Sequence, residues 1–447
     1  MSIETLAKTL PGVVVTDPDV LVSYRTDRSG LLGELPLAVA RPVDAGQVQD
    51  VVRWAAEHQV AVVPRGAGTG LAGGATGLAG AIVLSLERMR AIEIDPASRV
   101  AVVEPGALNG DVKRAAAEHG LWYPPDPSSF EICSIGGNVA TNAGGLCCVK
   151  YGVTTDYVLG LDVVLADGTL VTVGGRRVKD VAGMSLTKLF VGSEGALGIV
   201  TRAVLRLVPA PAAPSTLVAL FPSLLAAAAA VVEVGRTSRP SMVELMDRAA
   251  INAVEDYRPR GLDRSAEALL LFQSDAPGQA RADEIAAIHQ VCLRHGAAEI
   301  LETDDPDEGE QFVAARRDVL PAAERLGAVL IEDVGVEVPR LPALLGRVQE
   351  VAARWDVPVP LCAHAGDGNV HPLIVSTPAT AERAQAAFRE MLDAAIGLGG
   401  TITGEHGVGR LKADALPRQL GPDAAALAER IKKALDPDGI LNPGVGV

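Results

Sequence analysis

The sequence predicts an α+β fold of two layered domains, and three observations support this prediction. At 447 residues the chain exceeds the length that one hydrophobic core usually covers. Before the proline-rich stretch 209–214 (PAPAAP), short β-branched runs alternate with helical patterns. Beyond it, a strand–helix–strand rhythm appears twice, from Thr216 to about Glu302 and from about Val329 to Thr403. Two such copies favour an antiparallel sheet covered by helices.

The individual elements follow from periodicity and turn residues. Apolar spacing and glycine stops predict helices at Gln47–His58, Asp111–His119, Leu341–Trp355, Ala379–Leu398 and Ala424–Ala434. Short β-branched runs predict strands at Ala61–Pro64, Ala81–Leu86 and Ala101–Glu104. The turn pair Asp167-Gly168 between two alternating apolar runs predicts a hairpin over Leu161–Val173. The most apolar stretch, Leu217–Val234, is interrupted by a proline and a glutamate, so we expect a strand and a buried helix there, not a membrane span.

Composition narrows the classes of function. A formal net charge of −15 disfavours a polyanionic partner, so nucleic-acid binding is not expected. Five cysteines, with Cys147 and Cys148 adjacent, match neither a disulfide framework nor a zinc ribbon, which favours reduced thiols in a cytoplasm. The first residues lack the pattern of a secretory signal. We expect a cytoplasmic protein without a transmembrane segment, and peripheral association with a membrane stays open.

A glycine-rich loop, 64–74 (PRGAGTGLAGG), follows a predicted strand and raises the question of a dinucleotide fingerprint. A Rossmann site needs a helix that opens directly after the loop. Here glycines recur at 73, 74, 77 and 80, and each interior glycine costs a helix roughly 1 kcal/mol relative to alanine. The sequence therefore excludes a Rossmann site, while successive backbone N–H groups can still form a nest for phosphate oxygens. A flexible surface loop is the alternative.

Two further clusters of small residues favour the ligand interpretation. One comprises 124–127 (PPDP), 134–138 (SIGGN) and 141–145 (TNAGG), and the other is 191–201 (VGSEGALGIVT). Small residues and asparagine let the backbone pass close to a planar ring and hydrogen-bond its edge. Three such loops on one strand scaffold predict a large ligand with both phosphates and a flat ring.

These motifs resemble one family along nearly the whole chain. PRGAGTGLAGG, SIGGNVATNAGG with KYGV at 150–153, and KDVAGMSLTKLFVGSEGALGIVT at 179–201 are similar to the FAD-linked oxidases of the vanillyl-alcohol oxidase superfamily. The similarity is to the branch of D-lactate dehydrogenase, glycolate oxidase and D-2-hydroxyglutarate dehydrogenase. It implies a PCMH-type FAD-binding domain of two α/β subdomains in 1–209, and a substrate (cap) domain with a large antiparallel sheet in 210–403. A C-terminal segment, 404–447, would return to the FAD domain.

The resemblance also implies the cofactor contacts. The diphosphate would be bound by Arg65, Gly66, Ala67, Gly68, Thr69, Gly70, Leu71 and Gly74. The flavin would be approached by Ser134, Gly137, Asn138, Asn142, Gly144 and Gly145. The nucleotide side would involve Glu194, Gly198 and Ile199, and Pro125 and Asn442 are further implied contacts. Some relatives attach the flavin through a histidine near this loop, which has none here, so we expect non-covalent FAD.

Three of the seven histidines fall in two short motifs near the C-terminal end. His364 and His371 flank a Gly-Asp-Gly turn in HAGDGNVH, where a hairpin would let them face each other, and Glu405 and His406 lie between two glycines in GEHG. Two histidines and a carboxylate with an open position are a recurring catalytic metal set. On spacing alone, two histidines seven positions apart are more often unrelated. The concentration of three histidines beside glycine-rich turns, with Glu405 adjacent, makes a metal site and unrelated histidines equal alternatives.

The resemblance favours the metal site and assigns further roles. It implies that His364, His371 and Glu405 bind a divalent ion, with zinc or manganese as candidates, and that His406 acts as the base. An imidazole can take the hydroxyl proton of a 2-hydroxy acid near neutral pH. It also implies that Arg316 binds the substrate carboxylate through its guanidinium.

The substrate class follows from a departure from the branch. The D-2-hydroxyglutarate enzymes carry a lysine and a threonine for the distal carboxylate, at positions that align here with Ile331 and Leu320. We therefore expect a metal-assisted dehydrogenase for a small D-2-hydroxy acid resembling D-lactate or glycolate, and an external acceptor such as a quinone, a cytochrome or an electron-transfer flavoprotein. A homodimer stays open. The alternatives are D-2-hydroxyglutarate, an unrelated alcohol such as an aryl alcohol or ether-lipid precursor, and a non-catalytic subunit of a glycolate oxidase complex.

Overall fold

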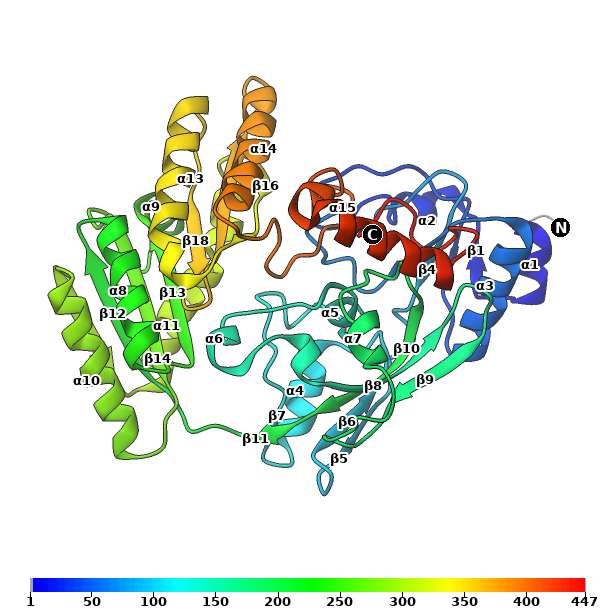
Figure 1. The fold of residues 1–447 in the computed structure, drawn as a ribbon, viewed down its shortest axis with the longest axis horizontal. Coiled ribbons are helices and arrows are strands. Elements are labelled where there is room, and N and C mark those ends of the chain that lie inside the picture. The colour runs from blue at the N-terminus through cyan, green and yellow to red at the C-terminus, as the bar shows by residue number, and fades with distance from the viewer. Residues whose placement is uncertain (1–2, 447) are drawn as a thin grey trace. The chain divides into compact units, whose positions relative to one another are not determined.

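The computed structural model describes residues 3–446, which divide into two compact units. Within the described residues, unit 1 comprises 3–144, 153–210 and 405–446, and unit 2 comprises 145–152 and 211–404. Each unit is built around its own sheets and helices (Figure 1). No helix among residues 3–446 is both long enough and apolar enough to cross a membrane.

Unit 1 contains two main sheets. The first has the strand order β1-β2-β4-β3 and consists of β1 (Val14–Val15), β2 (Ala38–Ala40), β4 (Ile82–Ser85) and β3 (Val62–Arg65). The second has the order β5-β6-β10-β8-β9 and consists of β5 (Ile92–Asp95), β6 (Val100–Val103), β10 (Ile199–Arg206), β8 (Val158–Val164) and β9 (Leu170–Gly174). A two-stranded ladder pairs β7 (Leu121–Trp122) with β11 (Val208–Pro209).

Helices of unit 1 cover these sheets because their apolar residues fall on one face. In α3 the buried residues Val48, Val51, Val52 and Ala55 follow helical spacing, and Asp44 caps the first turn by accepting a hydrogen bond from the Gln47 amide. The helical segments of unit 1 are α1 (Ile3–Thr9), α2 (Pro18–Val22), α3 (Ala45–His58), α4 (Asn109–Ala117), α5 (Ile135–Thr141), η1 (Thr154–Asp156), α7 (Leu186–Phe190) and α15 (Leu416–Leu435).

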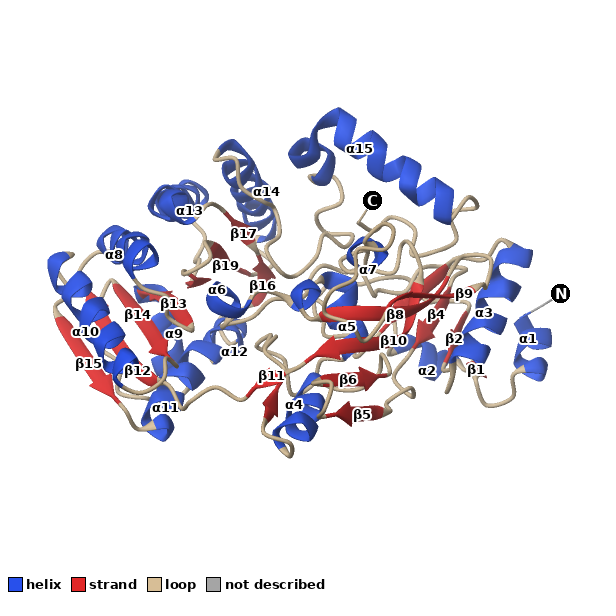
Figure 2. Cartoon of the chain, turned by 60° about the horizontal axis from the view of Figure 1, so that its bottom comes forward, coloured by secondary structure: helices blue, strands red, loops and turns tan. Residues whose placement is uncertain are grey.

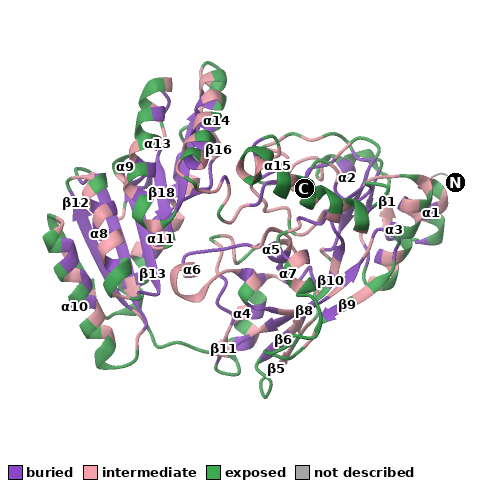
Figure 3. Cartoon of the chain, viewed as in Figure 1, coloured by how far each residue is buried: buried purple, intermediate pink, exposed green. Residues whose placement is uncertain are grey.

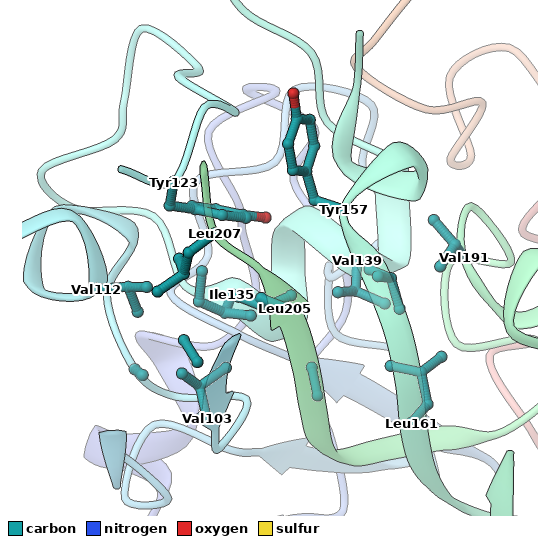
Figure 4. Close-up of a cluster of buried hydrophobic side chains, with 14 of the residues drawn as sticks. Val103, Val112, Tyr123, Ile135, Val139, Tyr157, Leu161, Val191, Leu205 and Leu207 are labelled. Carbon is teal, nitrogen blue, oxygen red and sulfur yellow. The ribbon is translucent and has the colours of Figure 1, made fainter. Parts of the chain in front are cut away.

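The core of the five-stranded sheet consists mainly of aliphatic side chains (Figure 4). Ile135 and Val139 from α5 pack there against Leu161 and Leu205 of the sheet. The rings of Tyr123 and Tyr157 meet edge to face, with centroids 6.1 Å apart. This packing fixes α5, which is why the loops on either side of it can hold a defined shape.

Unit 2 is built on one antiparallel sheet with the order β15-β12-β14-β13-β18-β19-β16, in which β17 also pairs with β19. Its strands are β12 (Ser215–Phe221), β13 (Met242–Asp247), β14 (Ala268–Ser274), β15 (Glu299–Thr303), β16 (Ala328–Ile331), β17 (Val334–Gly335), β18 (Leu361–His364) and β19 (Asn369–Ser376). Most of these strands are buried, as the purple ribbons of β12, β13 and β18 in Figure 3 show.

Helices cover both faces of this sheet (Figure 2). One face is covered by α8 (Leu224–Thr237), α10 (Gln279–Arg294), α13 (Leu341–Trp355) and α14 (Ala381–Gly397). The other is covered by α9 (Arg248–Tyr257), α11 (Pro306–Arg317) and α12 (Val319–Glu324). The remaining segments are η2 (Val338–Arg340) and α6 (Cys148–Tyr151), and α6 belongs to unit 2 because Lys150 and Tyr151 both bond to Asp275.

Most of the predicted elements are present in the structure. The hairpin across Asp167-Gly168 forms between β8 and β9, and the stretch from Leu217 to Val234 is a strand followed by a helix. The segment from Ser134 to Gly145 was expected to be a loop, and this prediction is wrong for its first half, which forms α5. Ser134 caps α5 by accepting a hydrogen bond from the Gly137 amide, and the core packing described above offsets the cost of its two glycines.

The cap of α9 gives a pH-dependent prediction. Burial raises the pKa of the Asp247 carboxyl to about 6, although Asp247 accepts hydrogen bonds from the amides of Ala250 and Leu361. A pKa above the unfolded value means that the contribution to folding is complete below about pH 4 and is lost as the pH rises through 6. Between pH 5 and 7.5 the wild type should therefore lose roughly 1.4 kcal/mol of unfolding free energy that Asp247→Asn keeps. Urea unfolding of both proteins at the two pH values measures this, and a difference independent of pH would contradict it.

Candidate cofactor and metal sites

The glycine-rich loop of unit 1 runs from β3 to β4 without a helix, as predicted. The backbone N–H groups of Gly68, Thr69 and Gly70 donate no hydrogen bond within residues 3–446. Three consecutive half-buried amides of this kind can receive phosphate oxygens. The guanidinium of Arg65 lies under the loop, where its Nη1 donates to the carbonyls of Thr26 and Ala75. The loop therefore has three amides available for phosphate oxygens, which is the requirement for an anion nest, and Arg65 supports its shape.

The loop meets the start of α5 within unit 1. The Ala67 amide donates to Ser134 Oγ at 3.2 Å, and a Cβ on Gly66 would lie 2.3 Å from the same oxygen, so a larger residue at position 66 would displace the Ser134 side chain. Asn138, in α5, is 3% exposed, and its Nδ2 has no hydrogen-bond partner among the described residues. A buried amide donor is costly unless it is satisfied. Together with the nest, this donor fits a ligand with a diphosphate and a polar ring edge, which are the features of FAD.

Two other predicted cofactor residues, Glu194 and Asn442, form hydrogen bonds within unit 1 that the sequence did not predict. Glu194 accepts hydrogen bonds from the amides of Val408 and Gly409, and burial raises its pKa. Asn442 Nδ2 donates to the carbonyls of Gly74 and Glu194. These bonds attach the C-terminal segment to the glycine-rich loop.

Arg410 was not predicted and acts at the same place. Its Nη1 donates to the Gly73 carbonyl at 2.8 Å, and its Nη2 donates to Asn442 Oδ1 at 2.9 Å. Since Arg410 is distant from the loop in sequence, only the fold reveals this contact.

The remaining predicted cofactor residues have local roles in packing and turns. Gly198 directly precedes β10, and a Cβ added at Gly198 would lie 2.4 Å from Val163 Cγ1. Ile199, the first residue of β10, is buried in the core. Asn142 ends α5 in the left-handed conformation, and its Oδ1 accepts from the Thr155 amide. The Pro125 carbonyl accepts from Asn109 Nδ2. Gly145 belongs to unit 2, and Gly144 is the last residue before it.

The predicted hairpin of unit 2 brings two histidines together. Residues His364 and His371 lie on β18 and β19, which pair antiparallel, with Cys362 opposite His371. Both rings are buried, their centroids are 5.0 Å apart, and their planes are nearly perpendicular. Both side chains lie on the face covered by α9, α11 and α12, because their neighbours two residues away, Cys362 and Leu373, belong to the core there.

Each histidine has a buried carboxylate beside its Nδ1. Glu244 Oε1 lies 2.7 Å from His364 Nδ1 in a hydrogen bond, and Asp333 Oδ1 lies 3.6 Å from His371 Nδ1. Asp333 also accepts from Thr403 Oγ1 at 2.6 Å, and its carbonyl accepts from the Gly404 amide at 3.0 Å. In the hydrogen-bonded pair, the carboxylate of Glu244 holds Nδ1–H of His364 and leaves Nε2 of that ring for a metal.

Arg316, the predicted carboxylate-binding residue, lies in the last turn of α11. Its side chain is 6% exposed, and its Nε lies 2.7 Å from Glu244 Oε2 in an ion pair. The neighbouring Arg317 pairs with Glu310 on the outside of the helix. The structure therefore separates these two candidates, because only Arg316 reaches the carboxylate that also holds His364.

Glu405 and His406 follow Gly404, the last residue of unit 2, and are joined to it directly by the chain. His364, His371 and Glu405 each offer a ligand atom, and these atoms lie within 4.8 Å of one another. Asp333, His371 and His406 form a second such group. Imidazole nitrogens with one carboxylate suit zinc and related divalent ions. The donor set therefore fits the metal site that the sequence suggested, and His406 Nε2 lies 3.6 Å from Glu405 Oε1.

The two apolar positions that argued against a dicarboxylate substrate lie on the same face of unit 2. Ile331 is the last residue of β16 and pairs with Leu373, two residues from His371 on β19. Ile331 and Leu320 both pack against the core on this face. Neither supplies a charge or a hydrogen-bond donor from its side chain.

Two carboxylates of this group were not predicted, Glu244 and Asp333. Glu244 lies 120 positions before its partner His364, so spacing could not connect them. The available signal was a single glutamate inside the apolar strand MVELMD of β13, because a charge in a buried strand needs a partner.

Comparisons with known proteins agree on the family of the chain. The family model for the FAD binding domain matches residues 36–174, and that for the C-terminal domain of FAD linked oxidases matches residues 210–445. The glycolate oxidase subunit GlcD of Bacillus subtilis is 40% identical over 427 residues, which cover 94% of this chain and 91% of that protein. The D-lactate dehydrogenase of Archaeoglobus fulgidus is 36% identical, with 91% and 90% covered.

A solved structure extends the agreement to the fold. The substrate-bound crystal structure of p-cresol methylhydroxylase matches with a TM-score of 0.80 at 18% identity, over 97% of this chain and 94% of that one. The fold is therefore of the PCMH type, with an FAD-binding domain and a second domain built on a large antiparallel sheet. On this evidence the chain belongs to the FAD-linked oxidases.

Proposed function

We propose that the protein oxidises a small D-2-hydroxy acid, such as D-lactate or glycolate, to the 2-oxo acid. The observation that carries this proposal is the arrangement on one face of the unit 2 sheet. There, His364 and His371 face each other, and His364 shares the carboxylate of Glu244 with the buried Arg316. Metal ligands beside a guanidinium suit a substrate with a hydroxyl next to a carboxylate. The relatives named glycolate oxidase subunit and D-lactate dehydrogenase support the same class.

In this proposal the chain's own residues bind the substrate and move its proton. Arg316 binds the carboxylate, and His406 takes the proton from the hydroxyl. His364, His371 and Glu405 would hold a divalent ion, zinc or manganese, which lowers the pKa of a coordinated hydroxyl. Bound without a covalent link, FAD would supply the acceptor for the hydride that leaves the substrate Cα.

The FAD contacts that we propose lie mainly in unit 1. The amides of Gly68, Thr69 and Gly70 would receive the diphosphate, and Asn138 Nδ2 would donate to the cofactor. The further contacts implied by the family resemblance are Arg65, Gly66, Ala67, Leu71, Gly74, Pro125, Ser134, Gly137, Asn142, Gly144, Gly145, Glu194, Gly198, Ile199 and Asn442. The free amides and the unpaired Asn138 donor support the first two assignments.

Electrons must then leave the protein to an external acceptor, for which we propose a quinone, a cytochrome or an electron-transfer flavoprotein. The five cysteines offer no cluster spacing for an iron–sulfur relay inside the chain. The word subunit in the name of the Bacillus subtilis relative supports assembly with other chains.

An anaerobic screen tests the proposal. Purified protein with FAD is mixed with D-lactate, L-lactate, glycolate and D-2-hydroxyglutarate, and flavin bleaching is followed by absorption. We expect fast bleaching by D-lactate or glycolate and slow bleaching by D-2-hydroxyglutarate, because Ile331 and Leu320 offer nothing to a second carboxylate. Bleaching by none of the 2-hydroxy acids would refute the proposed activity, and preference for D-2-hydroxyglutarate would refute the substrate class.

A further inference from the structure

We propose that Glu244 is a positioning residue that couples the candidate metal ligand His364 to the substrate-binding Arg316. The inference rests on the proposed function and goes beyond it. Oε1 of Glu244 is hydrogen-bonded to Nδ1 of His364, and Oε2 forms an ion pair with the guanidinium of Arg316. Loss of this carboxylate is therefore expected to weaken metal binding and substrate-carboxylate binding together.

The strand register explains how Glu244 reaches its first partner. Glu244 and His364 are direct partners across the antiparallel pair of β13 and β18, so their side chains lie on the same face. In β13, Met242 and Met246 flank Glu244 on this face, and both belong to the apolar core. The glutamate is thus the polar member of an otherwise apolar row, directly opposite the histidine.

The second partner comes from a helix. Arg316 lies in the last turn of α11, beside Ala315, which is part of the core that covers this face. The side chains of Glu244, His364 and Arg316 are 1%, 4% and 6% exposed, respectively. Bulk water screens little at such burial, so the anionic carboxylate is needed to balance the guanidinium.

The hydrogen bond to Nδ1 has a chemical consequence for the histidine. When a carboxylate accepts from Nδ1–H, it fixes the ring orientation and the tautomer whose Nε2 is free to ligate, and it makes that nitrogen more basic. Removing such a partner typically lowers metal affinity 10–100-fold. Here the same carboxylate also sets the position of Nε in Arg316, which links the two binding events through one side chain.

A purely structural role would give a different pattern. If Glu244 only neutralised the buried Arg316, its replacement would lower stability and carboxylate binding but would leave metal affinity unchanged. If it only oriented His364, carboxylate binding would be unchanged. The coupling role requires both affinities to fall in the same variant.

The experiment compares Glu244→Gln with wild type, both purified with FAD and stripped of metal by a chelator. Zinc or manganese binding is measured by calorimetry. The binding of propionate, a carboxylate without the reacting hydroxyl, is measured from the change in the flavin absorption spectrum. We expect metal affinity to fall 10–100-fold, as is typical for such partners. Propionate affinity should fall by about tenfold or more, because Arg316 loses the carboxylate that positions its guanidinium.

Asp318→Asn is the matched control, because Asp318 is another poorly exposed carboxylate of unit 2 that pairs with an arginine, Arg260. It should keep both affinities. Arg316→Lys should lose propionate affinity and keep metal affinity. Should Glu244→Gln not fold, Glu244→Asp keeps the charge but shortens the side chain by one methylene, and it should lower both affinities.

The outcomes separate this inference from the proposed function. A wild type that binds metal and a folded Glu244→Gln with both affinities unchanged would overturn the inference alone, as would the loss of only one affinity in that variant. A wild type that binds no stoichiometric divalent ion would overturn the metal-assisted function and the inference with it.

Discussion

Replacing His406 with glutamine is expected to slow flavin reduction by the best 2-hydroxy acid about 10²–10⁴-fold, the usual contribution of a general base. The reason is that glutamine cannot take the hydroxyl proton, while it keeps most of the size and polarity of the imidazole. His406 follows Glu405 directly and lies in one of the two groups of ligand atoms within 4.8 Å of one another. Stopped-flow measurement of anaerobic flavin reduction gives the rate.

Two controls make this test specific. FAD content should match the wild type, because the proposed cofactor contacts do not include His406. His295→Gln removes a histidine that pairs with Glu233 in unit 2, and the flavin of this variant should be reduced at the wild-type rate. An unchanged reduction rate in His406→Gln would rule out its role as the base.

Replacing His371 with alanine is expected to abolish stoichiometric metal binding and to lower the reduction rate by roughly 10³-fold. A metal that polarises the reacting hydroxyl contributes several kcal/mol, and 1.36 kcal/mol corresponds to a factor of ten in rate. Elemental analysis gives the metal content, and flavin reduction gives the rate. His371 lies in both groups of candidate ligands, so its removal should affect either arrangement.

Wild-type protein treated with a chelator is the matched comparison for His371→Ala. Wild-type protein stripped of metal should lose activity to a similar extent and recover it when zinc or manganese is returned, whereas His371→Ala should not recover. His289→Ala, which removes a histidine paired with Glu302 near the sheet edge, should keep its metal. Full activity of the stripped wild type would refute metal assistance.

Elements that are determined by neighbouring residues could be predicted from the sequence. The turn between His364 and His371 is defined by Gly-Asp-Gly, and the hairpin forms as expected because neighbouring residues determine it. The absence of a helix after the glycine-rich loop follows equally from its glycines. Helix α5 was missed because its stability comes from packing against Leu161 and Leu205, which no local pattern shows.

The partners of the candidate site depend on long-range pairing. The contact of Glu244 with His364 requires β13 to lie beside β18 in one particular register, and four other strands, β14 to β17, separate them in the chain. Arg410 reaches Gly73 across more than three hundred residues. The histidines and Arg316 can be predicted from the sequence. Glu244, which orients His364, can be identified only when the order of the strands in the sheet is known.

The pairing of β3 with the C-terminal segment has a consequence for biosynthesis. Val62 donates to the Ile440 carbonyl, and its neighbouring bridge to Leu441 lies along the outer edge of β3. A ribosome adding 5–20 residues per second needs roughly 10–40 s to make residues 211–404. During that time the nascent first unit lacks the segment that closes its edge strand and its glycine-rich loop. Uptake of the flavin should therefore be a late event in the life of the newly made chain, and a chaperone would have this interval in which to protect the open edge.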